Sequence, residues 1–142
     1  MSDQPTLIYT KFQLAEIQLE RALQLFLDEN DYICAVTLAG AAEELLGKLR
    51  EQSGETSELK AIIDECVAIG RNVYAEAWAT KLFSEVFTYP RNELKHIGDG
   101  SSIVILRDTA VPIISRAITN YRELTGKETQ IMTKFLAQCY AV

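Results

Sequence analysis

Apolar residues recur at intervals of three and four along most of this chain, the spacing that places them on one face of an α-helix. Most glycines and prolines fall at the joints between these periodic segments. We therefore predict an all-α protein with an extended connector over residues 101–106. The predicted helices cover about residues 11–28, 32–50, 57–69, 72–87, 90–98, 108–125 and 127–140.

Capping residues indicate where several of these helices begin. Thr10, followed three residues later by Gln13, matches a capping box, and Asp31 is suited to cap the second helix. Pro90 disfavours a helical conformation of the residue before it and is well suited to a first helical turn. We therefore expect one helix to end at residues 88–89 and a short new helix to begin at Pro90.

The length and composition of the chain fit one domain. A chain of 142 residues with 48% apolar content can bury about two thirds of its unfolded surface. We predict a single domain over residues 1–142, with a core at about 8–125 and a C-terminal helix at about 127–140. Because the sequence has neither a membrane-spanning apolar run nor a secretory signal, we expect a cytoplasmic protein without a membrane partner.

The three cysteines, Cys34, Cys66 and Cys139, do not form a recognisable metal or redox motif. Their number is odd, they are far apart, and no Cys-x-x-Cys spacing or nearby histidine completes a zinc site. We predict reduced, mostly buried thiols, and we expect neither a bound metal nor a cofactor.

Charge is distributed unevenly along the chain. The net charge is −6, which disfavours non-specific binding to nucleic acid, and we expect no binding to DNA. Residues 1–80 carry 14 acidic and 6 basic side chains, whereas residues 81–122 carry 4 acidic and 6 basic ones. The positive excess surrounds the chain's only histidine.

That histidine lies in the motif Arg91-Asn92-Glu93-Leu94-Lys95-His96. Histidine exchanges protons near neutral pH, and arginine is a permanently charged donor to phosphate oxygens. If Pro90 begins a helix, the first backbone N–H groups and the positive helix end also favour an anion there. The motif therefore indicates a phosphodiester substrate.

Metal-independent RNA cleavage needs a base for the 2′-hydroxyl, an acid for the leaving 5′-oxygen and positive charge at the phosphorus. His96 fits either proton-transfer role and Arg91 supplies the charge, while Lys95 and Arg107 are candidate phosphate contacts. One chain has a single imidazole. A homodimer that brings two motifs together would supply two.

Residues 91–96 resemble the Arg-x4-6-His motif of HEPN domains, in which a polar residue such as Asn92 commonly follows the arginine. The resemblance spans about residues 8–125 and includes the acidic, small-residue segment 38–44. It implies a HEPN-like bundle with a four-helix core and short extra helices. It also implies a metal-independent ribonuclease at a homodimer interface, with catalytic Arg91 and His96 oriented by Asn92.

The same resemblance implies a role as a toxin or defence element, in some cases paired with a nucleotidyltransferase antitoxin. Toxins silenced by nucleotide transfer carry a tyrosine two residues after the histidine, where this chain has Gly98. This difference argues against regulation by a nucleotidyltransferase but leaves the nuclease prediction unchanged.

Several alternatives remain open from the sequence. His96 can be an ordinary helix-terminal residue, with Arg91 in a surface ion pair with Glu93 or Glu85. The domain can also be a non-catalytic HEPN-like module that binds a nucleotide or a protein, or a structural subunit assembled through its last helix. Arg91 and His96 facing each other across a dimer axis would favour the enzyme, and an Arg91 held in an ion pair elsewhere would favour the module.

Other conspicuous side chains have structural interpretations. Glu43 and Glu44 resemble a paired-carboxylate site, but their Ala-rich helix indicates a solvated or capping face. Tyr74, Trp78 and Phe83 have the chemistry to stack on bases, but their helical spacing is more typical of a core.

Overall fold

The computed structural model describes residues 3–141, and this range consists of α-helices, one π-helical turn and connecting loops, without a β-strand. The all-α prediction is therefore confirmed. The elements in chain order are α1 (Lys11–Gln24), the π-helical turn η1 (Leu25–Glu29), α2 (Tyr32–Gln52), α3 (Glu58–Tyr74), α4 (Thr80–Glu93), α5 (Arg107–Thr125) and α6 (Gln130–Tyr140). None of the helices in residues 3–141 is both long and apolar enough to cross a bilayer.

Side-chain caps fix the helix starts that the sequence indicated. Thr10 and Gln13 form the predicted capping box, with reciprocal hydrogen bonds of 3.0 Å and 2.9 Å. Asp31 accepts a 3.0 Å hydrogen bond from the backbone N–H of Cys34 at the start of α2. Asn30 ends η1 in the left-handed region at φ 53°, which separates the first helical segment from the second.

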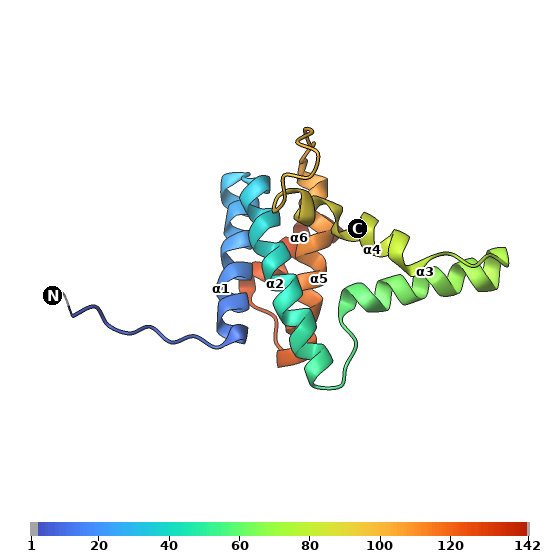
Figure 1. The fold of residues 1–142 in the computed structure, drawn as a ribbon. Coiled ribbons are helices and arrows are strands. Elements are labelled where there is room, and N and C mark those ends of the chain that lie inside the picture. Colours follow the sequence, from blue (N-terminus) through green and yellow to red (C-terminus); the bar gives the residue numbers. More distant parts are fainter. Residues whose placement is uncertain (1–2, 142) are drawn as a thin grey trace.

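Helices α1, α2, α5 and α6 form a bundle around one hydrophobic core (Figure 1). Helix α2 packs against α1 and α5, and α6 packs on the η1 end of the bundle through Phe135, whose ring meets that of Phe26 edge-on at 5.1 Å. The largest side chains that are fully buried in this core are Phe135, Leu19, Leu23, Leu46, Ile113, Ile114, Ile118, Met132 and Val36.

Helices α3 and α4 form a hairpin that extends away from the bundle, and residues 58–93 are called the arm below (Figure 1). Only Ile63, Gly70 and Thr88 are buried within the two arm helices. Gly70 of α3 permits close contact with the loop that joins the two helices, because a Cβ atom there would lie 2.5 Å from the ring of Trp78. The arm is therefore a thin, largely exposed unit.

Aromatic side chains stack along the arm instead of joining the core. Tyr74 stacks on Trp78 at a centroid distance of 5.2 Å, and Phe83 stacks on Phe87 at 6.2 Å. Tyr74 is 59% exposed, so the expectation that this aromatic set is core is wrong for it. The three cysteines are free, but Cys34 is exposed and the other two are only partly buried, which corrects the prediction of mostly buried thiols.

Pro90 does not begin a new helix. It lies inside α4, which continues to Glu93, and the backbone N–H of Leu94 still donates to the carbonyl oxygen of Pro90 at 3.2 Å. The carbonyl oxygen of Phe87, three residues before the proline, also accepts a 3.0 Å hydrogen bond from the guanidinium of Arg116. Contacts with the bundle thus outweigh the local preference on which the prediction of a helix start was based.

Candidate functional site

The site is organised around the carboxylate of Glu43, which lies on α2 and is only 2% exposed. It accepts a 3.3 Å hydrogen bond from Nη1 of Arg91 on α4. It also accepts hydrogen bonds from Nε and Nη2 of Arg116 on α5, the latter at 3.3 Å. The expectation that Glu43 lies on a solvated face is therefore wrong, because the buried stripe of α2 includes this position.

Arg91 reaches Glu43 by lying across α2 at a glycine. A Cβ atom on Gly40 would lie 2.9 Å from both Cγ and Cδ of Arg91, closer than side chains normally approach. The Arg91 side chain is 12% exposed, and its buried Nε has no hydrogen-bond partner among the described residues. Arg91 thus pairs with Glu43, and not with Glu93 or Glu85 as in the alternative left open from the sequence.

Asn120 extends this network to the base of the arm. Its Oδ1 accepts hydrogen bonds from Nη1 of Arg50 at 3.0 Å and from the backbone N–H of Glu58 at 2.9 Å. Its Nδ2 donates to the backbone carbonyl of Glu43 at 3.4 Å. The beginning of α3 is thereby tied to α2 and α5 at the same place where Arg91 ties α4.

The network carries a net positive charge close to the motif. One buried carboxylate faces two guanidinium groups, and the side chain of Arg116 is only 6% exposed. Guanidinium groups bind planar anions through two parallel donors, so this cluster is chemically suited to an oxyanion if one guanidinium turns toward it.

The sequence did not single out Arg116 or Asn120. Both lie in the buried stripe of α5 together with Ile113 and Ala117. A polar residue at a position where the helical period expects an apolar one could have indicated a buried polar contact.

Asn92 and Lys95 form hydrogen bonds to groups other than Glu43, the partner of Arg91. Nδ2 of Asn92 donates to Oγ1 of Thr88, one turn earlier on α4, at 3.1 Å. Nζ of Lys95 donates to Oε2 of Glu44 at 3.3 Å. Burial raises the pKa of Glu44, but hydrogen bonds from Lys48 and Lys95 and the charges of Lys95 and Arg91 lower it below its usual value overall.

His96 lies just beyond the C-terminal end of α4 and is exposed. Its backbone N–H donates to the carbonyl oxygen of Asn92 at 3.1 Å, so helix-like hydrogen bonding continues up to this residue. The motif is therefore at the negative end of a helix dipole, and the expected contribution of a positive helix end to phosphate binding is wrong.

Arg107 lies in a different environment from Arg91. Its guanidinium carbon is 5.1 Å from the ring centre of Phe26, and its Nη2 is 3.6 Å from Sγ of Cys139. These contacts place Arg107 against η1 and α6. Within one chain, Arg107 and Arg91 therefore contact different groups.

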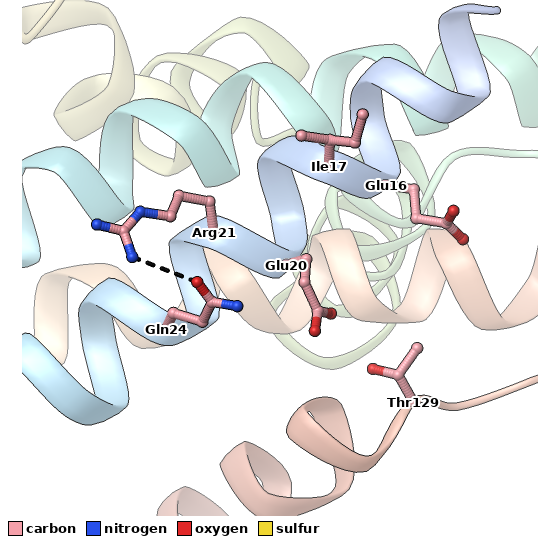
Figure 2. A pocket seen from close by; sticks show the side chains of 6 residues that line it. All are labelled: Glu16, Ile17, Glu20, Arg21, Gln24 and Thr129. Carbon is pink, nitrogen blue, oxygen red and sulfur yellow. Dashed lines mark hydrogen bonds between the residues drawn. The ribbon is translucent and has the colours of Figure 1, made fainter.

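A small hollow of about 190 Å³ opens beside the Glu43 network. Arg91, Glu43 and Asn120 line it, but His96 does not. A second hollow, of about 680 Å³, lies along α1 and includes no residue of the motif (Figure 2). Its polar side chains include Glu16, Glu20 and Arg21, and Arg21 already pairs with Glu29 at 3.0 Å.

Within residues 3–141, no group of three or more histidine, cysteine or acidic side chains is arranged to hold a metal ion. Comparisons of the chain with protein families, with characterised proteins and with solved structures found no match. The relation to HEPN domains therefore stays a prediction from the motif.

Proposed function

We propose that the chain is a HEPN-type, metal-independent endoribonuclease that acts as a homodimer. The observation that carries this proposal is that the segment ending α4 carries both an exposed imidazole, His96, and Arg91, which joins a buried cluster of two guanidinium groups and one carboxylate. Arg91 belongs to that cluster and precedes His96 by five residues. The combination supplies a proton-transfer group and positive charge, which are what cleavage of an RNA phosphodiester requires.

The proposed reaction is an internal transesterification. The 2′-oxygen attacks the adjacent phosphorus while one imidazole takes the 2′-hydroxyl proton, and the bond from phosphorus to the 5′-oxygen breaks. A second imidazole gives a proton to that 5′-oxygen, leaving a 2′,3′-cyclic phosphate and a 5′-hydroxyl. Because each chain has one histidine, the second imidazole comes from His96 of the partner subunit.

In this proposal Arg91 offsets the negative charge that develops on the phosphate oxygens. Glu43 holds the Arg91 side chain against α2. Because Arg116 binds the same carboxylate, the negative charge of Glu43 neutralises Arg91 only in part. Asn92 is proposed to help orient the motif through its bond to Thr88, and Lys95 and Arg107 to contact phosphates farther along the RNA.

The biological setting that fits this activity is a cytoplasmic toxin or defence element. Gly98 occupies the position of the tyrosine that nucleotidyltransferase antitoxins modify. If a partner silences this protein, we propose that it does so by another route.

The test is cleavage of a single-stranded RNA in EDTA. We expect 2′,3′-cyclic phosphate ends, and no cleavage when the scissile 2′-hydroxyl is replaced by hydrogen. His96→Ala and Arg91→Ala should each lower the rate by roughly a hundredfold or more. Arg122→Ala is the control, because Arg122 is half exposed and pairs with Glu128 on the surface. Activity that survives both motif substitutions would remove the assignment.

A non-catalytic binding module is the second candidate, and one observation favours it. Arg91 is held in an ion pair with Glu43 and faces the bundle, whereas His96 is exposed beyond the end of α4. Under this alternative the wild-type protein binds an RNA or a nucleotide without cleaving it. His96→Ala would then leave the dissociation constant, measured by fluorescence anisotropy, unchanged.

A further inference from the structure

The outward face of α4 carries an uncovered apolar stripe. Leu82, Val86 and Tyr89 follow one another at intervals of four and three, and are 57%, 58% and 50% exposed. Together with Glu85 they line a shallow hollow of about 330 Å³. Monomeric proteins seldom leave such a stripe uncovered on a helix, so the face is suited to contact with another molecule.

Helix α3, the other helix of the arm, also exposes large apolar side chains. Ile69, Val73 and Tyr74 of α3 are 42%, 69% and 59% exposed. The three side chains of the α4 stripe present on the order of 300 Å² of surface, against the roughly 800 Å² that each partner buries in a standard interface. The stripe can therefore form the apolar centre of an interface whose rim is polar.

The charge of α4 favours a second copy of this chain as the occupant. Helix α4 carries two basic and two acidic residues, whereas residues 1–80 as a whole are strongly acidic. Glu85, at the edge of the stripe, already pairs with Lys81 of its own helix at 3.8 Å. Two copies can thus meet through α4 without the repulsion expected between their acidic bundles.

The stripe also leads directly to His96. At about 100° per residue, His96 lies about 20° from Tyr89 around the helix axis, whereas Arg91 lies about 160° from Tyr89. The hydrogen bond from the His96 backbone to Asn92 keeps this helical register. Arg91 therefore faces its own bundle while His96 follows the uncovered face.

We infer that the stripe formed by Leu82, Val86 and Tyr89 is the surface on which a second copy of the chain docks, with two-fold symmetry. A two-fold contact uses the same patch on both copies, which an apolar stripe with a neutral edge satisfies. Docking covers the helix face that carries His96. The step from docking to activity rests on the proposed ribonuclease function, whereas the docking surface itself does not.

The experiment measures the oligomeric state of the full chain by sedimentation velocity at micromolar concentration. We expect the wild type to be a dimer of twice 15.9 kDa, and Val86→Glu and Leu82→Glu to be monomers with unchanged far-UV circular dichroism. Ile17→Glu is the matched control, because Ile17 is 53% exposed on α1 and should leave the dimer intact. A wild-type monomer, or a dimer that survives both stripe substitutions, overturns the inference.

RNA cleavage by the same variants separates the docking surface from the function. If the inference and the function are both right, Val86→Glu is monomeric and cleaves at least roughly a hundredfold more slowly than Ile17→Glu. A wild-type dimer that is dissociated by Val86→Glu but never cleaves RNA supports the docking surface and removes the nuclease. A Val86→Glu monomer that cleaves at the wild-type rate overturns the link between this surface and His96.

Discussion

Glu43 is the residue on which the geometry of the candidate site depends most directly. Its carboxylate is shared by Arg91 and Arg116, and these three side chains join α2, α4 and α5. Removing one member of a buried ion cluster is costly because the remaining charges lose their compensation without regaining water. Removing the Glu43 carboxylate would also remove the contact that holds Arg91 of the motif against α2.

Glu43→Ala should therefore lower the free energy of unfolding by about 3 kcal/mol or more. Its neighbour provides a matched control, because Glu44 is 41% exposed and pairs with Lys48 and Lys95 at the surface. Glu44→Ala should cost less than about 1 kcal/mol. Urea unfolding followed by circular dichroism measures both, and equal losses in the two variants would contradict a structural role for the buried carboxylate.

The sequence predicted part of this site and misjudged the rest for a definable reason. The motif was visible because residues 91–96 are contiguous. The partners of Glu43 lie 48 and 73 residues away, and periodicity indicates only that a position is buried, not which side chain meets it. Glu43 follows Ala39 and Ala42 in the buried stripe of α2, so its burial, though not its partners, was predictable.

At the scale of elements, local signals predicted some helix boundaries correctly and others wrongly. Thr10 and Asp31 act within a few residues, so their caps form as expected. The helix over residues 80–93 passes through Pro90 because Arg91 and the Phe87 carbonyl both bind groups of the bundle. Such long-range contacts override a local preference worth about 3 kcal/mol.

The contact between α1 and α5 predicts a specific loss of stability in alkali. Tyr121 on α5 donates a 2.9 Å hydrogen bond to Glu16 on α1. Burial, this bond and the charges of Glu16 and Glu20 raise the pKa of Tyr121 to about 12. Because the folded pKa lies above the usual value of 10.0, the contribution of this group is complete below pH 10 and is lost as the pH rises toward 12.

Wild-type protein should therefore lose about 1 kcal/mol more stability than Tyr121→Phe when the pH rises from 8 to 11. The phenylalanine keeps the ring that stacks on Phe12 at 5.8 Å but has no proton to lose. Urea midpoints of both proteins at the two pH values give the difference. A parallel decline in the two proteins would show that Tyr121 does not titrate differently in the folded state.

At the scale of the whole molecule, most of the buried apolar residues lie in the bundle and few lie in the arm. The hydrophobic cluster of the structure lies in α1, η1, α2, α5 and α6, while the arm helices bury only three residues. Periodicity revealed the apolar faces of α3 and α4 but not what covers them. The sequence therefore predicted helices throughout and gave no indication that two of them extend from the bundle.

This division predicts that the arm of an isolated chain unfolds before the bundle. Trp78 is the only tryptophan, and it lies between α3 and α4 in contact with Tyr74, so its fluorescence reports on the arm. Circular dichroism reports mainly on the longer and better buried bundle. In dilute protein, the fluorescence transition should occur at lower urea concentration than the dichroism transition.

Protein concentration then tests what stabilises the arm. If a second copy covers the stripe of α4, binding linkage raises the fluorescence midpoint as the protein concentration increases, until the two transitions coincide. In Val86→Glu the transitions should stay apart at every concentration, because the covering surface is lost. Coincident transitions in dilute wild-type protein would mean that the base of the arm, tied down by Asn120 and Arg91, is enough to make it unfold together with the bundle.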